Sequence, residues 1–233
     1  MTEEFSENQI EELNHRARRA CSALKIFPLP GVVLYPGIPV PLHVFEPRYR
    51  ALLRDALAGD RMLAIATLVD SEDAPLEHAR VHPLAGACLV EMDQALPDGR
   101  FEIVVRGAAR VKLVEELDRG QPYREFRAEV LEDHYPPGGP AAVNSEAEML
   151  RQCVFELSSL LPPESGARQL AESAARQRSP GVLADLVAAA VVSEPEDRVA
   201  LLAELDVRRR LERATTEVAG VILMLSRGRS LSV

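Results

Sequence analysis

The chain has 233 residues, of which 47% are hydrophobic, 27% charged and 4% aromatic, and its formal net charge is -9. This composition is typical of a globular protein with an aliphatic core and excludes a chain that is disordered throughout. The longest apolar run, residues 186–192, is far shorter than the roughly 20 residues that span a bilayer, which disfavours a membrane helix. The net charge is negative and Lys25 and Lys112 are the only lysines, which disfavours a nucleic-acid partner.

The first expected element is an amphipathic helix over residues 3–24. Its apolar positions recur at helical spacing, at Ile10, Leu13, Ala17, Ala20 and Leu24. We treat residues 1–24 as an amino-terminal helix or extension that docks on the body of the protein or on a partner.

Residues 27–53, FPLPGVVLYPGIPVPLHVFEPRYRALL, combine frequent prolines with aliphatic residues. Proline has no amide donor, so this stretch cannot form a helix or a central strand. Positions 38, 40, 42 and 44 alternate as one buried strand face should. Pro39 and Pro41 lie in the opposite row and predict an edge strand or a bulged junction. A helix over Tyr49–Ala58 follows.

The rest of the amino-terminal half is rich in strand signals. Pro97-Asp98-Gly99 predicts a tight turn between antiparallel strands. A meander with one helix fits a curled, partly closed β-barrel. The expected strands are Lys25–Leu29, Ile38–Phe45, Met62–Val69, Ala87–Leu96, Phe101–Arg106, Arg110–Glu115 and Phe126–Asp133.

Residues 135–140, YPPGGP, interrupt regular structure, so we divide the chain into a β-rich part, 25–140, and a helical part, 141–233. The expected helices are Ala142–Leu161, Ala167–Ala175, one that begins with Ser179 as cap and Pro180, Glu196–Glu204, and a last one capped by Asp206. The last helix has an apolar stripe that we expect to be buried in its own bundle rather than in a coiled-coil dimer: Val207, Leu211, Ala214, Val218, Ile222 and Leu225. The arginine run 208–210 predicts a solvated face.

Three motifs in this order resemble the amino-terminal substrate-binding domain of ATP-dependent Lon proteases, which also occurs alone as a short protein. They are the stretch at 27–53, the segment Leu96-Pro97-Asp98-Gly99-Arg100 with FEIVVRGAARVKL, and Ser179-Pro180-Gly181-Val182-Leu183-Ala184-Asp185 with its later helical matches. The resemblance covers about Lys25 to Arg227. It implies an α+β fold: a PUA-like β pseudo-barrel subdomain with one inserted helix, followed by a carboxy-terminal helical bundle.

Catalytic and metal signals are weak. No phosphate-binding glycine loop adjoins either lysine, which excludes an ATPase site. Ser22-x-x-Lys25 has the spacing of a serine hydrolase dyad but lacks companion motifs, and Glu77, His78 and His82 are better explained by a solvated loop than by a metal site. Cys21, Cys88 and Cys153 indicate neither a disulfide framework nor zinc. We therefore expect no catalytic residue, cofactor or metal.

The expected function is non-enzymatic recognition of polypeptide segments or a protein partner, in the cytoplasm because the acidic start lacks a secretory signal. Aromatic side chains in the first motif are the candidate contacts: Tyr35, His43, Phe45 and Tyr49. Each of these side chains could instead pack the two subdomains together. Two alternatives stay open: an adaptor that docks on a Lon-type protease or another ATPase through the amino-terminal helix, and a hydrolase that uses Ser22 and Lys25.

Overall fold

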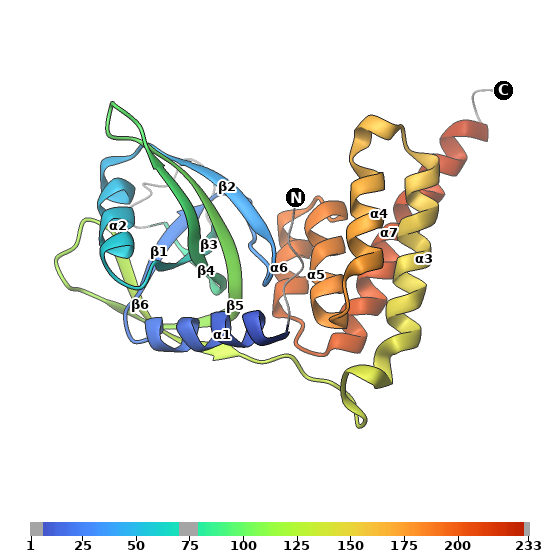
Figure 1. Cartoon of the computed structure of the whole chain (residues 1–233), viewed down its shortest axis with the longest axis horizontal. Coiled ribbons are helices and arrows are strands. Elements are labelled where there is room, and N and C mark those ends of the chain that lie inside the picture. The colour runs from blue at the N-terminus through green and yellow to red at the C-terminus, as the bar shows by residue number, and fades with distance from the viewer. Residues whose placement is uncertain (1–6, 70–78, 231–233) are drawn as a thin grey trace. The chain divides into compact units, whose positions relative to one another are not determined.

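The computed structural model describes residues 7–69 and 79–230, which divide into two compact units. The first unit includes the described residues up to Glu132, and the second begins at Asp133. We call them the β unit and the helical unit. Figure 1 shows the β unit in blue to green and the helical unit mainly in yellow to red.

The β unit is a nearly closed barrel with one additional edge strand. Among the described residues, six strands form one sheet in the order β2-β5-β4-β3-β1-β6, and β6 also pairs with β5. This second pairing closes five of the strands into a ring and leaves β2 at the edge, as expected for a PUA-like pseudo-barrel. Its elements are α1 (Glu7–Ala20), β1 (Leu24–Leu29), β2 (Pro39–Val44), α2 (Pro47–Ala58), β3 (Met62–Leu68), β4 (Val81–Ala95), β5 (Phe101–Leu117) and β6 (Arg124–Leu131).

The central parts of β3, β4 and β5 are buried on both faces. Leu13 and Ala17 of α1 belong to a core cluster with one set of strand residues. Leu52 and Leu53 of α2 belong to a second cluster with residues of the opposite parity. This double coverage explains why β3 reads as a continuous apolar run instead of an alternating one. The amino-terminal helix therefore docks on its own β unit.

Strand β5 differs from its prediction. The sequence predicts two strands separated at Gly107, but the structure has one continuous strand. The Gly37 N–H donates to the Gly107 carbonyl oxygen over 2.8 Å, and the Gly107 N–H donates to that of Ile38 over 3.0 Å. A Cβ at Gly107 would lie 2.0 Å from the Tyr35 carbonyl oxygen. The glycine allows the 35–38 segment to cross β5 and does not interrupt the strand.

The helical unit has its own core. The apolar stripe of α7 packs into this core, fully buried through Val218 and partly buried beyond it, which confirms burial in its own bundle. The Arg209 N–H donates to Asp206 Oδ1 over 3.2 Å, so the predicted cap is confirmed. Ser179 occupies the cap position of α5 without a capping bond from its side chain. The elements are η1 (Gly139–Val143), α3 (Asn144–Leu160), η2 (Pro163–Ser165), α4 (Ala167–Arg176), α5 (Pro180–Val191), α6 (Pro195–Ala203) and α7 (Val207–Ser230).

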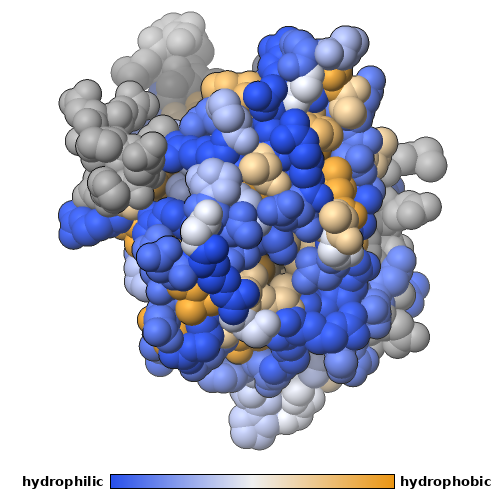
Figure 2. Space-filling model, turned by 90° about the vertical axis from the view of Figure 1, so that its left-hand side faces the viewer, coloured by the Kyte–Doolittle hydropathy of each residue, from blue (hydrophilic) through white to orange (hydrophobic). Residues whose placement is uncertain are grey.

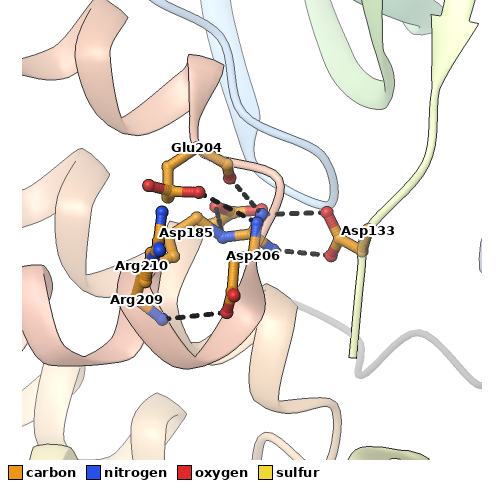
Figure 3. Close-up of polar contacts among 6 residues, drawn as sticks. All are labelled: Asp133, Asp185, Glu204, Asp206, Arg209 and Arg210. Atoms are coloured by element: carbon orange, nitrogen blue, oxygen red, sulfur yellow. Dashed lines mark hydrogen bonds and ion pairs between the residues drawn. The ribbon is translucent and has the colours of Figure 1, made fainter. Parts of the chain in front are cut away.

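The prediction that the arginine run 208–210 is solvated is wrong for Arg210, whose side chain is 0% exposed. Its Nη1 and Nη2 donate to the two carboxylate oxygens of Asp133 over 2.9 and 2.5 Å, and its Nε lies 3.2 Å from Asp185 Oδ1 (Figure 3). Burial lowers the pKa of Arg210, but the two carboxylates outweigh burial, so the pKa is raised. The sequence could not show this because Asp133 and Asp185 come from distant segments.

Within the described ranges, no helix is both long and apolar enough to cross a membrane.

Candidate peptide-binding groove

The edge position of β2 confirms the prediction made from its prolines. Val40 is paired with Val105, and the Gly107 N–H bonds to Ile38, so the even-numbered residues of β2 exchange hydrogen bonds with β5. The backbone groups of Pro39, Pro41 and His43 then point away from β5. Two of these three positions lack an N–H, so this edge is a poor template for an added strand.

A groove of about 670 Å³ lies over β2, β5 and β4. The strand register places its lining side chains in rows across the three strands. One row is Pro41, Val104 and Met92, and the next is His43, Glu102 and Gln94. An apolar row thus lies beside a polar row that contains a carboxylate.

The groove and its border expose large apolar side chains. Met92 is 67% exposed, and Phe45, which follows β2, is 60% exposed. The rings of His43 and Phe45 are stacked with centroids 6.1 Å apart. Exposed Met and aromatic side chains are typical of surfaces that bind other chains.

The β4–β5 turn fixes the polar border of the groove. The Arg100 N–H donates to Asp98 Oδ1 over 3.1 Å, and Arg100 Nε donates to Asp98 Oδ2 over 2.6 Å. This backbone N–H and the Arg100 guanidinium lower the pKa of Asp98. Arg100 Nη1 lies 3.2 Å from His43 Nε2. The predicted turn at residues 97–99 is confirmed, and it connects Asp98 to the groove residue His43.

The four aromatic candidates separate into two pairs. Tyr35 is completely buried, and Tyr49 is buried with its ring 4.3 Å from that of Phe27. Burial raises the pKa of the Tyr49 hydroxyl. His43 and Phe45 are exposed and lie together at the groove. The second pair is exposed to a ligand, whereas Tyr49 lines a smaller cavity of about 420 Å³ with little of its side chain accessible.

Met92 and Glu102 are groove residues that were not among the predicted contacts. Cys88 and Val90 are buried, so alternation predicts that Met92 also points inward. The pairing of β4 with β5 shifts register between Val90 and Met92, and this bulge turns Met92 outward. No local residue pattern predicts the bulge, so the exposure of Met92 cannot be predicted from the sequence.

The residues considered above for catalysis or metal binding do not form such a site within the described residues. The Ser22 hydroxyl donates to the Arg19 carbonyl oxygen over 3.5 Å. Glu77 and His78 lie outside the described residues, and His82 Nδ1 accepts the Leu84 N–H over 3.4 Å. In residues 7–69 and 79–230, no group of three or more His, Cys, Asp or Glu side chains is placed to hold a metal.

The architecture is that of an α+β domain in which a pseudo-barrel with a groove at its edge strand precedes a helical bundle. Comparison with known families then identifies the family. The model of the ATP-dependent protease La (LON) substrate-binding domain matches residues 23–219. The chain belongs to this family.

Similar full-length proteins are Lon proteases. The Lon protease of Roseiflexus castenholzii is 33% identical over 199 residues, which are 82% of this chain and 23% of that protein. That of Syntrophus aciditrophicus is 30% identical over 210 residues, 88% of this chain and 26% of that protein. The chain thus spans about a quarter of the length of these relatives.

Solved structures show the same fold. The N-terminal domain of a Mycobacterium avium complex Lon protease matches with a TM-score of 0.63 and 18% identity, covering 84% of this chain and 98% of that one. A Lon N-terminal domain protein from Xanthomonas campestris matches with a TM-score of 0.55 and 20% identity, covering 82% and 95%. The α+β pseudo-barrel with a helical bundle is therefore the fold of Lon N-terminal domains, and the family fits a role in substrate recognition.

Proposed function

We propose that this chain recognises extended segments of unfolded polypeptides and holds them in the groove over β2, β5 and β4. The observation that carries the proposal is the accessible apolar surface of Met92 and Phe45 at a groove of about 670 Å³. A cavity of this size accommodates several side chains. Membership of a substrate-binding family supports the same role.

The mode of binding follows from the edge strand. A peptide that added a strand to β2 would need donors that Pro39 and Pro41 do not have. Side-chain contacts with Met92, Val104 and Phe45 need no such donors. We therefore propose that apolar contacts hold the peptide in the groove and that it does not extend the sheet.

Binding to immobilised, reduced and carboxymethylated lactalbumin tests the proposal. The double variant Phe45→Ala and Met92→Ala should bind about tenfold more weakly, since burial of large apolar side chains contributes on the order of 1.5 kcal/mol or more. Phe155→Ala with Met224→Ala is the matched control, because these residues are each 69% exposed in the helical unit. Equal binding by the groove variant and the wild type would exclude this site.

Action by binding alone is part of the proposal. A serine-directed acylating probe that labelled Ser22 in the folded protein would contradict it. An adaptor that docks on a Lon-type protease or another ATPase through the apolar stripe of α1 is a weaker proposal. Leu13 and Ala17 of that stripe are buried in the β unit and would have to leave its core.

A further inference from the structure

We infer that the groove selects extended segments in which a positively charged side chain stands between two apolar side chains, each two residues away. This inference rests on the proposed function and adds a substrate class to it. It follows from the order of the side-chain rows and from the charge of the middle row.

The rows have the same spacing as an extended peptide. Along β5 the outward positions are Val104 and Glu102, and along β2 they are Pro41 and His43. Phe45 follows β2, and its ring is stacked on that of His43, with the centroids 6.1 Å apart. Successive rows are two residues apart, which is about 6.6 Å in a strand. Alternate side chains of an extended ligand that lies parallel to the strands have the same repeat. They would meet the Val104 row, the Glu102 row and Phe45 in turn.

The middle row contains the carboxylate of Glu102, which can pair with a positively charged side chain of a ligand. Asp93 at the groove is paired with Arg61 over 2.6 Å, and Asp98 at the turn is paired with Arg100. Glu102 is exposed and forms no ion pair with any residue of the described chain. Apolar surface lies on both sides of it, at Met92 and Phe45. A lysine or arginine between two apolar ligand side chains complements this arrangement in charge and in spacing.

Fluorescence anisotropy of the whole chain with labelled peptides tests the inference at about pH 8. The peptides share a leucine–serine–X–serine–phenylalanine centre with lysine, glutamine or glutamate at X. Lysine should bind up to about fivefold more tightly than glutamine, with glutamate weakest, as expected for one exposed ion pair. Added salt should reduce the preference.

Variants at Glu102 test whether its carboxylate causes the preference for lysine. Glu102→Gln should abolish the preference for lysine, and Glu102→Lys should reverse it toward glutamate. Glu129→Gln removes the same charge from an exposed position on β6 and should leave the preference unchanged. A preference that persists in Glu102→Gln would overturn the inference.

A spacing control separates this inference from the proposed function. Moving the lysine by one position in the peptide should cost the preference, because alternate side chains of an extended chain point to opposite sides. If all peptides bind equally and the Phe45→Ala variant weakens each of them, the inference fails and the groove stands. If the Phe45 and Met92 variants weaken none of them, the groove itself is excluded.

Discussion

The ion-pair cluster around Arg210 in the helical unit and the groove in the β unit differ in how exposed their side chains are. The helical unit buries a charge, because Arg210 is 0% exposed and Asp185 beside it is 1% exposed. The β unit leaves Met92 and Phe45 exposed near the charged side chains of Glu102 and Arg100. Removing one partner of a buried ion pair lowers stability because the other charge stays buried without a partner. An exposed apolar surface is instead available to a ligand. Substitutions should therefore affect stability in the first region and binding in the second.

Exposed apolar residues also differ in their distribution. In the helical unit they lie on α3 and α7, at Met149, Phe155, Leu223 and Met224. In the β unit, Phe45 and Met92 lie at one groove, and the less exposed Val69 and Val114 lie elsewhere. The side of the molecule in Figure 2 is mostly hydrophilic, with apolar residues in small separate patches. Among the described residues, the two most exposed large apolar side chains of the β unit therefore lie at the groove.

The largest effect is expected from Arg210→Leu in the helical unit. The substitution leaves Asp185 buried without its cation, and loss of one partner of a buried pair costs about 3–5 kcal/mol. Urea unfolding followed by circular dichroism at the helical band measures this loss. The neighbour Arg209 is exposed, so Arg209→Leu should change stability by less than about 0.5 kcal/mol. Similar losses in both variants would mean that the buried pairs do not stabilise the unit.

A smaller loss is expected from Gly107→Ala in the β unit. The new methyl group would lie 2.0 Å from the Tyr35 carbonyl oxygen, so the crossing segment must move, at a cost of about 3 kcal/mol. Tyrosine fluorescence reports mainly on this unit, since Tyr35, Tyr49 and Tyr123 belong to it and only Tyr135 belongs to the helical unit. Gly220 of α7 has open space around it, and Gly220→Ala should stabilise its helix by up to about 1 kcal/mol. A β unit unchanged by Gly107→Ala would contradict the close approach.

The sequence predicted features that depend on neighbouring residues. Pro39 and Pro41 predicted the edge strand, and Asp206 predicted its cap, because a missing donor or a capping oxygen acts within a few residues. The outward turn of Met92 depends on a bulge in the pairing with β5. The burial of Arg210 depends on Asp133, far away in the chain. Such features arise from pairing in space, and a single sequence has no local signal for them.

The smallest effect is a pH dependence that distinguishes two cysteines. Burial raises the pKa of the Cys88 thiol in the β unit. The unfolded thiol loses its proton above about pH 8.5 while the folded one keeps it, so stability is full below that pH and falls by about 1.4 kcal/mol per pH unit above it. Cys88→Ala should reduce this slope in the unfolding free energy measured by tyrosine fluorescence between about pH 8.5 and 9.5. Burial also raises the pKa of Cys21 in the same unit, so that thiol contributes the remaining slope. Cys153 belongs to the helical unit, so Cys153→Ala should leave that slope unchanged. An identical slope in wild type and Cys88→Ala would show that the buried thiol does not keep its proton.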